Sequence, residues 1–265
     1  AGPSPPPQRE AQMAEPLTAA SAPPLLEANG LAKHFGGFVA LDTIDLAVAE
    51  GERLGLIGPN GSGKSTLVNC LCGTLRHDAG AITFAGRRLD RVPAYQRTRL
   101  GLARSFQLPR PFRTMSLVEN LRIPLLYSVN ARSGPHLHHA AIDERCLQLL
   151  AEVGLADKAR RLPRDLTQVE MRKLELARAV ASAPRLLFAD EAMAGLSPSE
   201  VEEILGVLFR LNETGITIVL IEHIMRAVMS FSTRLVVLVA GHKIADGEPQ
   251  EAMRNPEVER AYLGE

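Results

Sequence analysis

No apolar run in this sequence approaches the length of a membrane-spanning helix. The longest runs are Ile216–Ile221 and Leu235–Ala240, whereas a span needs about 20 consecutive apolar residues. We therefore expect a soluble chain, or one that reaches a membrane only through a partner.

The sequence also has few cysteines and no excess of either charge. Its 265 residues include three cysteines, and 30 basic side chains balance 30 acidic ones. Three cysteines do not suggest a disulfide framework, and we expect all three to be small buried apolar residues. Without a basic surplus, nothing in the composition favours a nucleic-acid partner.

Residues 1–24 have little apolar material and many prolines and alanines. Such a segment buries too little surface to offset the entropy of ordering, so we predict a disordered tail or linker. The remainder, residues 25–265, is apolar enough for a sizeable core and long enough for one large domain or two small ones.

What the sequence does contain is a phosphate-binding loop of the pattern G-x-x-x-x-G-K-[ST]. It consists of Gly58, Pro59, Asn60, Gly61, Ser62, Gly63, Lys64, Ser65 and Thr66. The apolar run Arg53–Ile57 before it predicts a buried strand. Leucines follow at the four-residue spacing of a helix, namely Leu67, Leu71 and Leu75. A strand before the loop and a helix after it are the context that supports the motif.

The residue types of this loop suit a phosphate chain. Glycines let the backbone curl so that several N–H groups point at one centre, and the helix start adds the positive end of its dipole. The Lys64 ammonium can reach the terminal phosphates, and the Ser65 hydroxyl can hold a magnesium ion.

A second motif ends another apolar run, Arg185–Ala189, which predicts a buried parallel strand. The run ends in the adjacent carboxylates Asp190 and Glu191, which point to opposite sides. Asp190 can help to hold magnesium, usually through water, and Glu191 can polarise an attacking water. Two unrelated surface acids at a strand end are the alternative.

Three further residues have local interpretations that stay open. Phe35, next to two glycines, could stack on a purine base or fill the core. Gln107 alone carries no signal, because most glutamines lie on the surface. His223 follows a predicted strand and could bond a terminal phosphate or be structural.

His136, His138 and His139 lie in a polar stretch without a carboxylate or cysteine framework, which favours a solvated loop over a metal site.

The pattern along the chain predicts a mixed fold. Strand patterns surround the phosphate loop and return after residue 185, whereas residues 116–181 are largely helical in pattern. We expect strands at Leu25–Leu31, Val39–Val48, Ala81–Ala85 and Ile216–Ile221, a hairpin at 235–245, and helices at Ile142–Gly154, Pro198–Leu211, Gln250–Arg254 and Pro256–Leu263. Ser116 and Glu119 have the spacing of a capping box.

The order of these pieces resembles the ATP-binding subunit of ABC transporters over residues 25–265. Arg104–Gln107 is similar to the Q-loop of that family, Ala194–Ser197 to its D-loop, and Glu222–Met225 to the segment of its switch histidine. The ending Asn255–Glu265 resembles the branched-chain amino acid importer group, and ATPases of lipopolysaccharide transport share part of it.

The resemblance implies an α/β fold: a P-loop ATPase core with an antiparallel β subdomain and a helical insertion at about residues 108–181. It implies ATP and Mg²⁺ as cofactors, with two such subunits, identical or different, closing head to tail on two ATP molecules. Gln107 then contacts magnesium and water, Phe35 stacks on the base, and His223 senses the γ-phosphate. Hydrophobic permease subunits would dock near the Q-loop on the cytoplasmic face of the membrane, with a solute-binding protein as an indirect partner.

Two departures from the family pattern stand out. The signature, roughly Leu-Ser-Gly-Gly-Gln in the family, is replaced here by Leu166–Glu170, and alanine follows Glu191 where proline is usual. We expect Thr167 either to cap the following helix or to offer its hydroxyl across the dimer; the alternative is a helix start with no contact to nucleotide. Glu170 would fold back on the cap, and the side chain of Val169 would hinder close approach to the phosphate.

The resemblance implies an ATPase subunit that powers an importer of amino acids or similar small polar solutes, and two other function classes compete with it. Soluble ABC ATPases that act on DNA or ribosomes usually carry coiled-coil insertions or two ATPase domains, and neither fits in this chain. A regulator that binds ATP without hydrolysing it is suggested only by the altered signature, and Glu191 and His223 argue against it.

Overall fold

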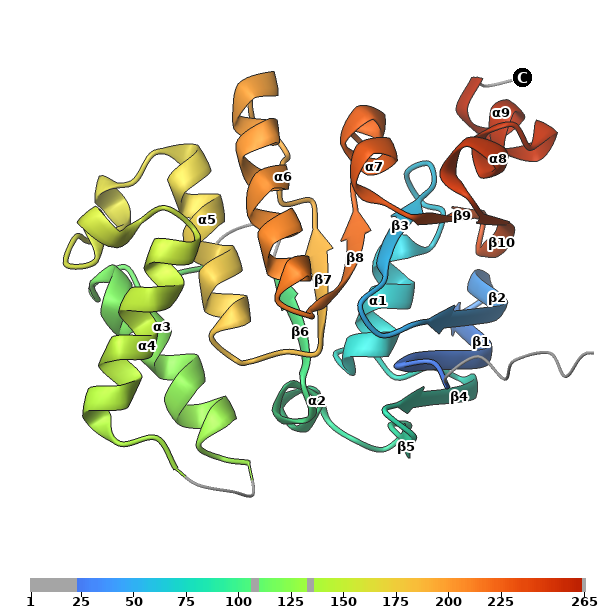
Figure 1. Cartoon of the computed structure of the whole chain (residues 1–265). Helices are drawn as coiled ribbons and strands as arrows, with labels where there is room; N and C mark the ends of the chain where they lie inside the picture. Colours follow the sequence, from blue (N-terminus) through green and yellow to red (C-terminus); the bar gives the residue numbers. More distant parts are fainter. Residues whose placement is uncertain (1–22, 106–109, 133–135, 264–265) are drawn as a thin grey trace, which may run out of the picture.

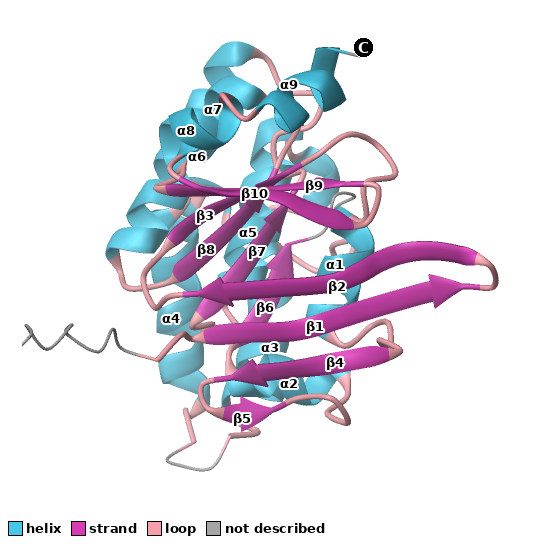
Figure 2. Cartoon of the chain, turned by 90° about the vertical axis from the view of Figure 1, so that its right-hand side faces the viewer, coloured by secondary structure: helices cyan, strands magenta, loops and turns pink. Residues whose placement is uncertain are grey.

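The computed structural model describes residues 23–105, 110–132 and 136–263, which form two β-sheets with helices packed around them (Figure 1). One sheet is antiparallel, in the order β2-β1-β4-β5. Its strands are β1 Leu26–Phe35, β2 Phe38–Val48, β4 Ala79–Phe84 and β5 Arg87–Arg88. β1 and β2 form a long hairpin in which Phe35 pairs with Phe38 at the tip (Figure 2).

The second sheet carries the phosphate loop. Its order is β10-β9-β3-β8-β7-β6, and every neighbouring pair is parallel except β9 with β10. The strands are β3 Arg53–Ile57, β6 Leu102–Ser105, β7 Leu186–Asp190, β8 Thr217–Ile221, β9 Arg234–Val239 and β10 His242–Gly247. Because β3, β7 and β8 run in parallel, their carboxyl ends meet at one edge, where ligands bind in open α/β sheets.

Six helices belong to this strand-rich part of the chain. They are α1 Lys64–Cys72, α2 Ala94–Leu100, α6 Pro198–Glu213, α7 Met225–Phe231, α8 Pro249–Met253 and α9 Pro256–Leu263. The expectation that Leu75 continues the first helix is wrong. Gly73 adopts a left-handed conformation (φ 77°) and caps the helix, so Leu75 lies beyond it.

All the regular secondary structure described between β6 and β7 is helical, and this stretch lies to one side of the parallel sheet (Figure 1). It comprises α3 Leu117–Pro124, the π-helical turn Leu125–Val129, α4 His139–Glu152, the 3₁₀ turns Ala156–Lys158 and Pro163–Asp165, and α5 Gln168–Val180. The expected capping box starts α3. The Glu119 N–H donates to Ser116 Oγ, and the Glu119 carboxylate accepts from the Ser116 N–H.

Two cores hold these layers together. One joins the antiparallel sheet, α1 and one side of the parallel sheet, and includes Phe84 and Phe188. The other joins the opposite side of the parallel sheet to α6, α7 and the helical stretch, and includes Met193 and Phe231. Both sides of the parallel strands are therefore covered, which explains their continuous apolar sequences.

The predicted class is confirmed: an α/β fold with an antiparallel subdomain and a helical insertion. The expected hairpin is β9–β10, and Cys70, Cys72 and Cys146 are all buried, as predicted. Among the described residues, no helix has both the length and the apolar character to span a bilayer. The tail prediction for residues 1–24 falls almost wholly outside the described residues.

Candidate nucleotide-binding site

A cavity of about 230 Å³ lies where β3 gives way to the phosphate loop. Ten of the residues singled out in the sequence line it: Phe35, Asn60, Gly61, Ser62, Gly63, Lys64, Ser65, Thr66, Glu191 and His223. Phe38, Ala40 and Ile221 complete the wall, and sequence reasoning had missed all three. Residues from four separate regions of the sequence therefore meet at one small cavity.

Two glycines allow the loop to take this shape. A Cβ on Gly58 (φ 152°) would lie 2.1 Å from the Leu238 carbonyl oxygen, and one on Gly63 (φ 103°) would lie 2.6 Å from that of Ala40. Neither position has room for a side chain, and both torsions suit only glycine. Gly63 is also the N-cap of α1, so the free N–H groups of that helix begin at the loop.

The Lys64 side chain folds back over its own loop. Its Nζ donates to the carbonyl oxygens of Gly58 at 2.7 Å and Pro59 at 3.0 Å. Burial lowers the pKa of Lys64, and the nearby carboxylates of Glu191 and Asp190 oppose that shift. The ammonium therefore has partners here that it must give up in order to contact a bound anion.

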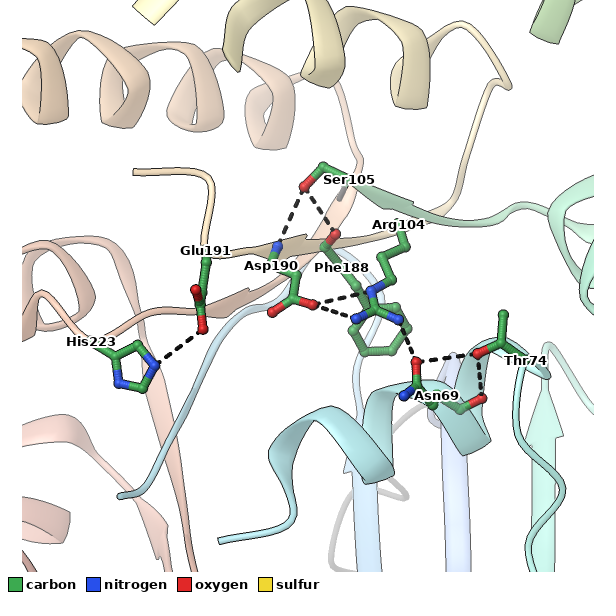
Figure 3. A network of polar contacts seen from close by, with 8 residues as sticks. All are labelled: Asn69, Thr74, Arg104, Ser105, Phe188, Asp190, Glu191 and His223. Carbon is green, nitrogen blue, oxygen red and sulfur yellow. Dashed lines mark hydrogen bonds and ion pairs between the residues drawn. The ribbon is translucent and has the colours of Figure 1, made fainter. Parts of the chain in front are cut away.

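The paired acids diverge as the sequence predicted (Figure 3). Asp190 ends β7 and turns towards Arg104, whose Nε and Nη2 donate to its Oδ2 at 3.1 and 2.5 Å. Glu191 adopts φ 48°, uncommon for a residue with a side chain, and turns towards His223. Glu191 Oε1 and His223 Nε2 lie 3.2 Å apart.

The donor set suits magnesium. Ser65 lines the cavity and offers a hydroxyl oxygen, whereas Asp190 is not among the lining residues but offers a carboxylate oxygen at the end of β7; hard oxygen donors are what Mg²⁺ prefers. Among the described residues, no group of three or more His, Cys, Asp or Glu side chains could hold a metal. A nucleotide-bound magnesium ion needs only one or two protein oxygens, because the phosphates and water supply the rest.

Two aromatic rings stand at the mouth of the cavity. Phe35 and Phe38 are both exposed and both line it, and the Lys33 ammonium lies 5.4 Å from the centre of the Phe35 ring. Phe35 is therefore not core filler. Its exposed ring is available for stacking, as is that of Phe38.

The altered signature starts α5 with the predicted capping box. The Glu170 N–H donates to Thr167 Oγ1 at 3.4 Å, and the Glu170 carboxylate accepts from the Thr167 N–H at 3.0 Å. Lys158 adds an ion pair to Glu170 at 2.5 Å and, as the largest cause, holds the pKa of that carboxyl below its usual range. The Glu170 side chain is thus fully occupied within its own chain.

Val169 differs from the expectation. Its side chain is only 9% exposed and packs in the core that contains α5. It therefore does not stand between the helix start and a phosphate of another subunit, and any ligand contact at this position would come from the backbone. Thr167 remains exposed at the helix start.

A buried acid that sequence reasoning missed lies beside His223. Glu222 is 2% exposed, and its Oε1 accepts the Met193 N–H at 2.8 Å. Burial raises the pKa of Glu222 to about 7, and Glu191 and Asp190 add to that rise. Gln107, the remaining predicted site residue, lies outside the described residues.

Residues 41–194 match the sequence model of the protein family described as ABC transporter. The LivG protein of Salmonella typhimurium, a high-affinity branched-chain amino acid transport ATP-binding protein, is 39% identical over 91% of this chain and 98% of its own length. BraF of Pseudomonas aeruginosa, described in the same words, is 37% identical over the same share of each chain.

The chain belongs to the ABC transporter family.

Solved structures of this family agree with that assignment. A nucleotide-free ATP-binding cassette from an ABC transporter superposes with a TM-score of 0.80 and 30% identity, over 91% of this chain and all of the other. An ADP-bound cassette gives a TM-score of 0.81 at the same identity, over 92% of this chain. The chain is thus an ABC-type ATPase.

Proposed function

We propose that this ABC-type ATPase powers an importer of branched-chain amino acids or similar small polar solutes. The observation that best supports a hydrolytic role is the convergence of Lys64, Glu191 and His223 on one cavity. The choice of solute rests on the likeness to LivG and BraF, which extends over nearly the whole of those proteins.

The phosphate loop and the start of α1 would hold the phosphates of ATP. The loop's converging backbone N–H groups and the dipole of α1 favour an anion at the loop. The Lys64 ammonium would exchange its contacts with the Gly58 and Pro59 carbonyl oxygens for contacts with phosphate oxygens. Ser65, Asp190 and Gln107 would hold Mg²⁺, usually with water between Asp190 and the ion. When bound, the ion would neutralise phosphate charge during transfer.

Glu191 is suited to orient and deprotonate the attacking water. Its carboxylate lines the cavity and lies 3.2 Å from the His223 imidazole. His223 would hold that carboxylate in place through Nε2 and contact the γ-phosphate through its other ring nitrogen. A positioned base of this kind typically contributes about 10²–10⁴ in rate.

A second ATP-binding subunit, identical or different, would complete the site. Thr167 is exposed at the start of α5, where helix N–H groups favour an anion from the facing subunit. Within one chain, the Arg172 guanidinium at this helix donates to the Ala194 carbonyl oxygen at 3.2 Å. That contact would join the signature segment to the loop after Glu191.

A groove beside β6 offers a docking place for the membrane permease. Its cavity has a volume of about 330 Å³ and lies between β6, α2 and the helical stretch, with Phe112, Ile123 and Tyr127 in its wall. Phe112 and Tyr127 are exposed. The groove adjoins the strand that leads to Gln107, so a cytoplasmic segment of the permease seated there would act next to the nucleotide site.

Docking of this kind would place the chain on the cytoplasmic face of the inner or plasma membrane. A solute-binding protein on the far side would be an indirect partner, and we expect no nucleic-acid partner. The solute itself would be selected by the permease and the binding protein.

Co-expression with permease subunits encoded nearby, followed by co-purification, tests this function. The unaltered chain should co-purify and Tyr127→Glu should not, because a charge would enter the apolar groove. Leu147→Glu, on the exposed side of α4, is the matched control and should co-purify normally. Failure of the unaltered chain to bind a permease would favour a soluble ABC ATPase. Uptake of no amino acid by the assembled complex would favour another transport system, such as one for lipopolysaccharide.

A further inference from the structure

Arg104 is a cation held against Asp190, the acid that we propose helps to hold Mg²⁺. Its guanidinium binds Asp190 Oδ2 through two nitrogens, and both side chains are largely buried, at 17% and 9% exposure. Arg104 Nη1 also donates to Asn69 Oδ1 at 2.6 Å, so the guanidinium is fixed between β7 and α1 (Figure 3).

The strand pairing brings this arginine to Asp190. β6 runs parallel to β7 with Arg104 opposite Phe188, two residues before Asp190. The neighbouring residue Ser105 ties the strand ends together, since its Oγ accepts the Asp190 N–H at 3.3 Å. The contact between Arg104 and Asp190 is thus set by backbone that is itself held in place.

The pair uses only one of the two carboxylate oxygens. Both Arg104 nitrogens bond to Oδ2, and Figure 3 shows the other oxygen turned away from the guanidinium. Within the part of the chain that the structure describes, Oδ1 accepts no hydrogen bond. Asp190 can therefore bind a cation through Oδ1 while Arg104 already balances its negative charge at Oδ2.

We propose that Arg104 is the counter-ion of Asp190 in the nucleotide-free subunit and sets how much Mg²⁺ the site requires. This inference rests on the proposed ATPase function. A neighbouring unit of positive charge weakens the binding of a second cation, and the effect is strong where burial limits screening. Arg104 thus stabilises the empty site and raises the Mg²⁺ concentration needed to fill it.

This role differs from that of a structural ion pair in its response to Mg²⁺. Removing one partner of a buried pair leaves an uncompensated charge and destabilises any protein. Only at Asp190 would a bound Mg²⁺ ion relieve that charge. Loss of Arg104 should therefore destabilise the empty protein and strengthen its response to Mg²⁺.

Arg234 provides a matched control. Its guanidinium binds Asp246 through two nitrogens, at 2.6 and 3.1 Å, and Glu52 at 2.9 Å. It begins β9, at the amino end of the parallel strands and away from the nucleotide cavity. Arg234→Gln should lower stability as Arg104→Gln does, without changing the dependence on Mg²⁺.

The test is thermal unfolding of the full chain carrying Glu191→Gln, so that ATP is not consumed. Unfolding temperatures are measured with ATP and EDTA, and then across a titration of Mg²⁺. Arg104→Gln should lower the Mg²⁺ concentration at half-maximal stabilisation by roughly tenfold, as expected for one partly screened charge. An unchanged or higher midpoint would overturn the inference, and a higher one would mean that Arg104 orients Asp190 for the ion.

Asn69→Ala keeps the inference testable if Arg104→Gln does not fold. It removes the other anchor of the guanidinium and should lower the midpoint by roughly threefold, the effect of one weakened hydrogen bond. No change in the midpoint would count against the inference. If the parent protein is not stabilised by ATP and Mg²⁺ at all, the proposed function fails instead.

Discussion

His223 Nε2 lies 3.2 Å from Glu191 Oε1, although the two residues are 32 positions apart in the chain. Their strands explain the contact, because β7 and β8 are parallel neighbours and each residue follows its strand closely. The arrangement gives Glu191 a fixed partner at the wall of the nucleotide cavity.

Phe35→Ala should weaken ATP binding while leaving inorganic triphosphate binding nearly unchanged. Base stacking on an aromatic ring contributes roughly 1–3 kcal/mol, so the dissociation constant for ATP should rise about tenfold. Equilibrium binding of both ligands measures the difference. Phe38→Ala is the matched comparison, because Phe38 also lines the cavity; a larger loss of ATP affinity in that variant would transfer the stacking role to Phe38.

Thr167→Arg should prevent the ATP-driven dimerisation of the Glu191→Gln protein. The long cationic side chain would occupy the helix start where the facing subunit must bring its phosphate. Thr167→Ser is the control, because it keeps the capping box with Glu170 and should dimerise normally. Sedimentation with saturating ATP and Mg²⁺ decides the matter, and dimerisation of the arginine variant would exclude a phosphate contact in this segment.

Glu222→Gln should stabilise the protein relative to the parent, and the gain should be larger at pH 8 than at pH 5. In the folded chain the pKa of Glu222 rises to about 7 from the ordinary 4.5, so the native state holds its proton more tightly than the unfolded state does. Stability therefore falls as pH rises from 4.5 to 7, by roughly 3 kcal/mol at most. Glutamine keeps an acceptor for the Met193 N–H but cannot ionise.

Thermal unfolding of both proteins from pH 5 to pH 8 measures this effect. The difference in unfolding temperature, variant minus parent, should become more positive as pH rises. A difference that stays constant with pH would mean that Glu222 ionises in the folded chain as easily as it does in water.

Much of the fold and most of the cavity could be predicted because their signals are local. The phosphate loop is a contiguous motif, β7 and β8 are unbroken apolar runs, and the capping box of α5 lies within four residues. Such patterns depend on backbone conformation and burial, which neighbouring residues decide. Leu75 shows the limit, since a helical spacing continued past the glycine that ends α1.

What the sequence did not predict depends on pairing between distant segments. Arg104 and Asp190 are 86 positions apart, and a single arginine before Gln107 has no pattern of its own. Glu222 directly follows the end of β8, and only the packing around it shows that it is buried. Val169 fills the core although its sequence position suggested a role at the surface. Side-chain direction at a helix start is set by tertiary packing, which spacing alone does not encode.

Steady-state ATP turnover of Glu191→Gln tests the central assignment most directly, with Lys64→Ala as the comparison. Glutamine keeps the shape of the side chain but cannot accept a proton, so turnover should fall by about 10²–10⁴ while ATP binding is retained and a closed dimer accumulates. Lys64→Ala should instead weaken ATP binding itself, because it removes a charge aimed at the phosphates. Unchanged turnover in Glu191→Gln would contradict the account.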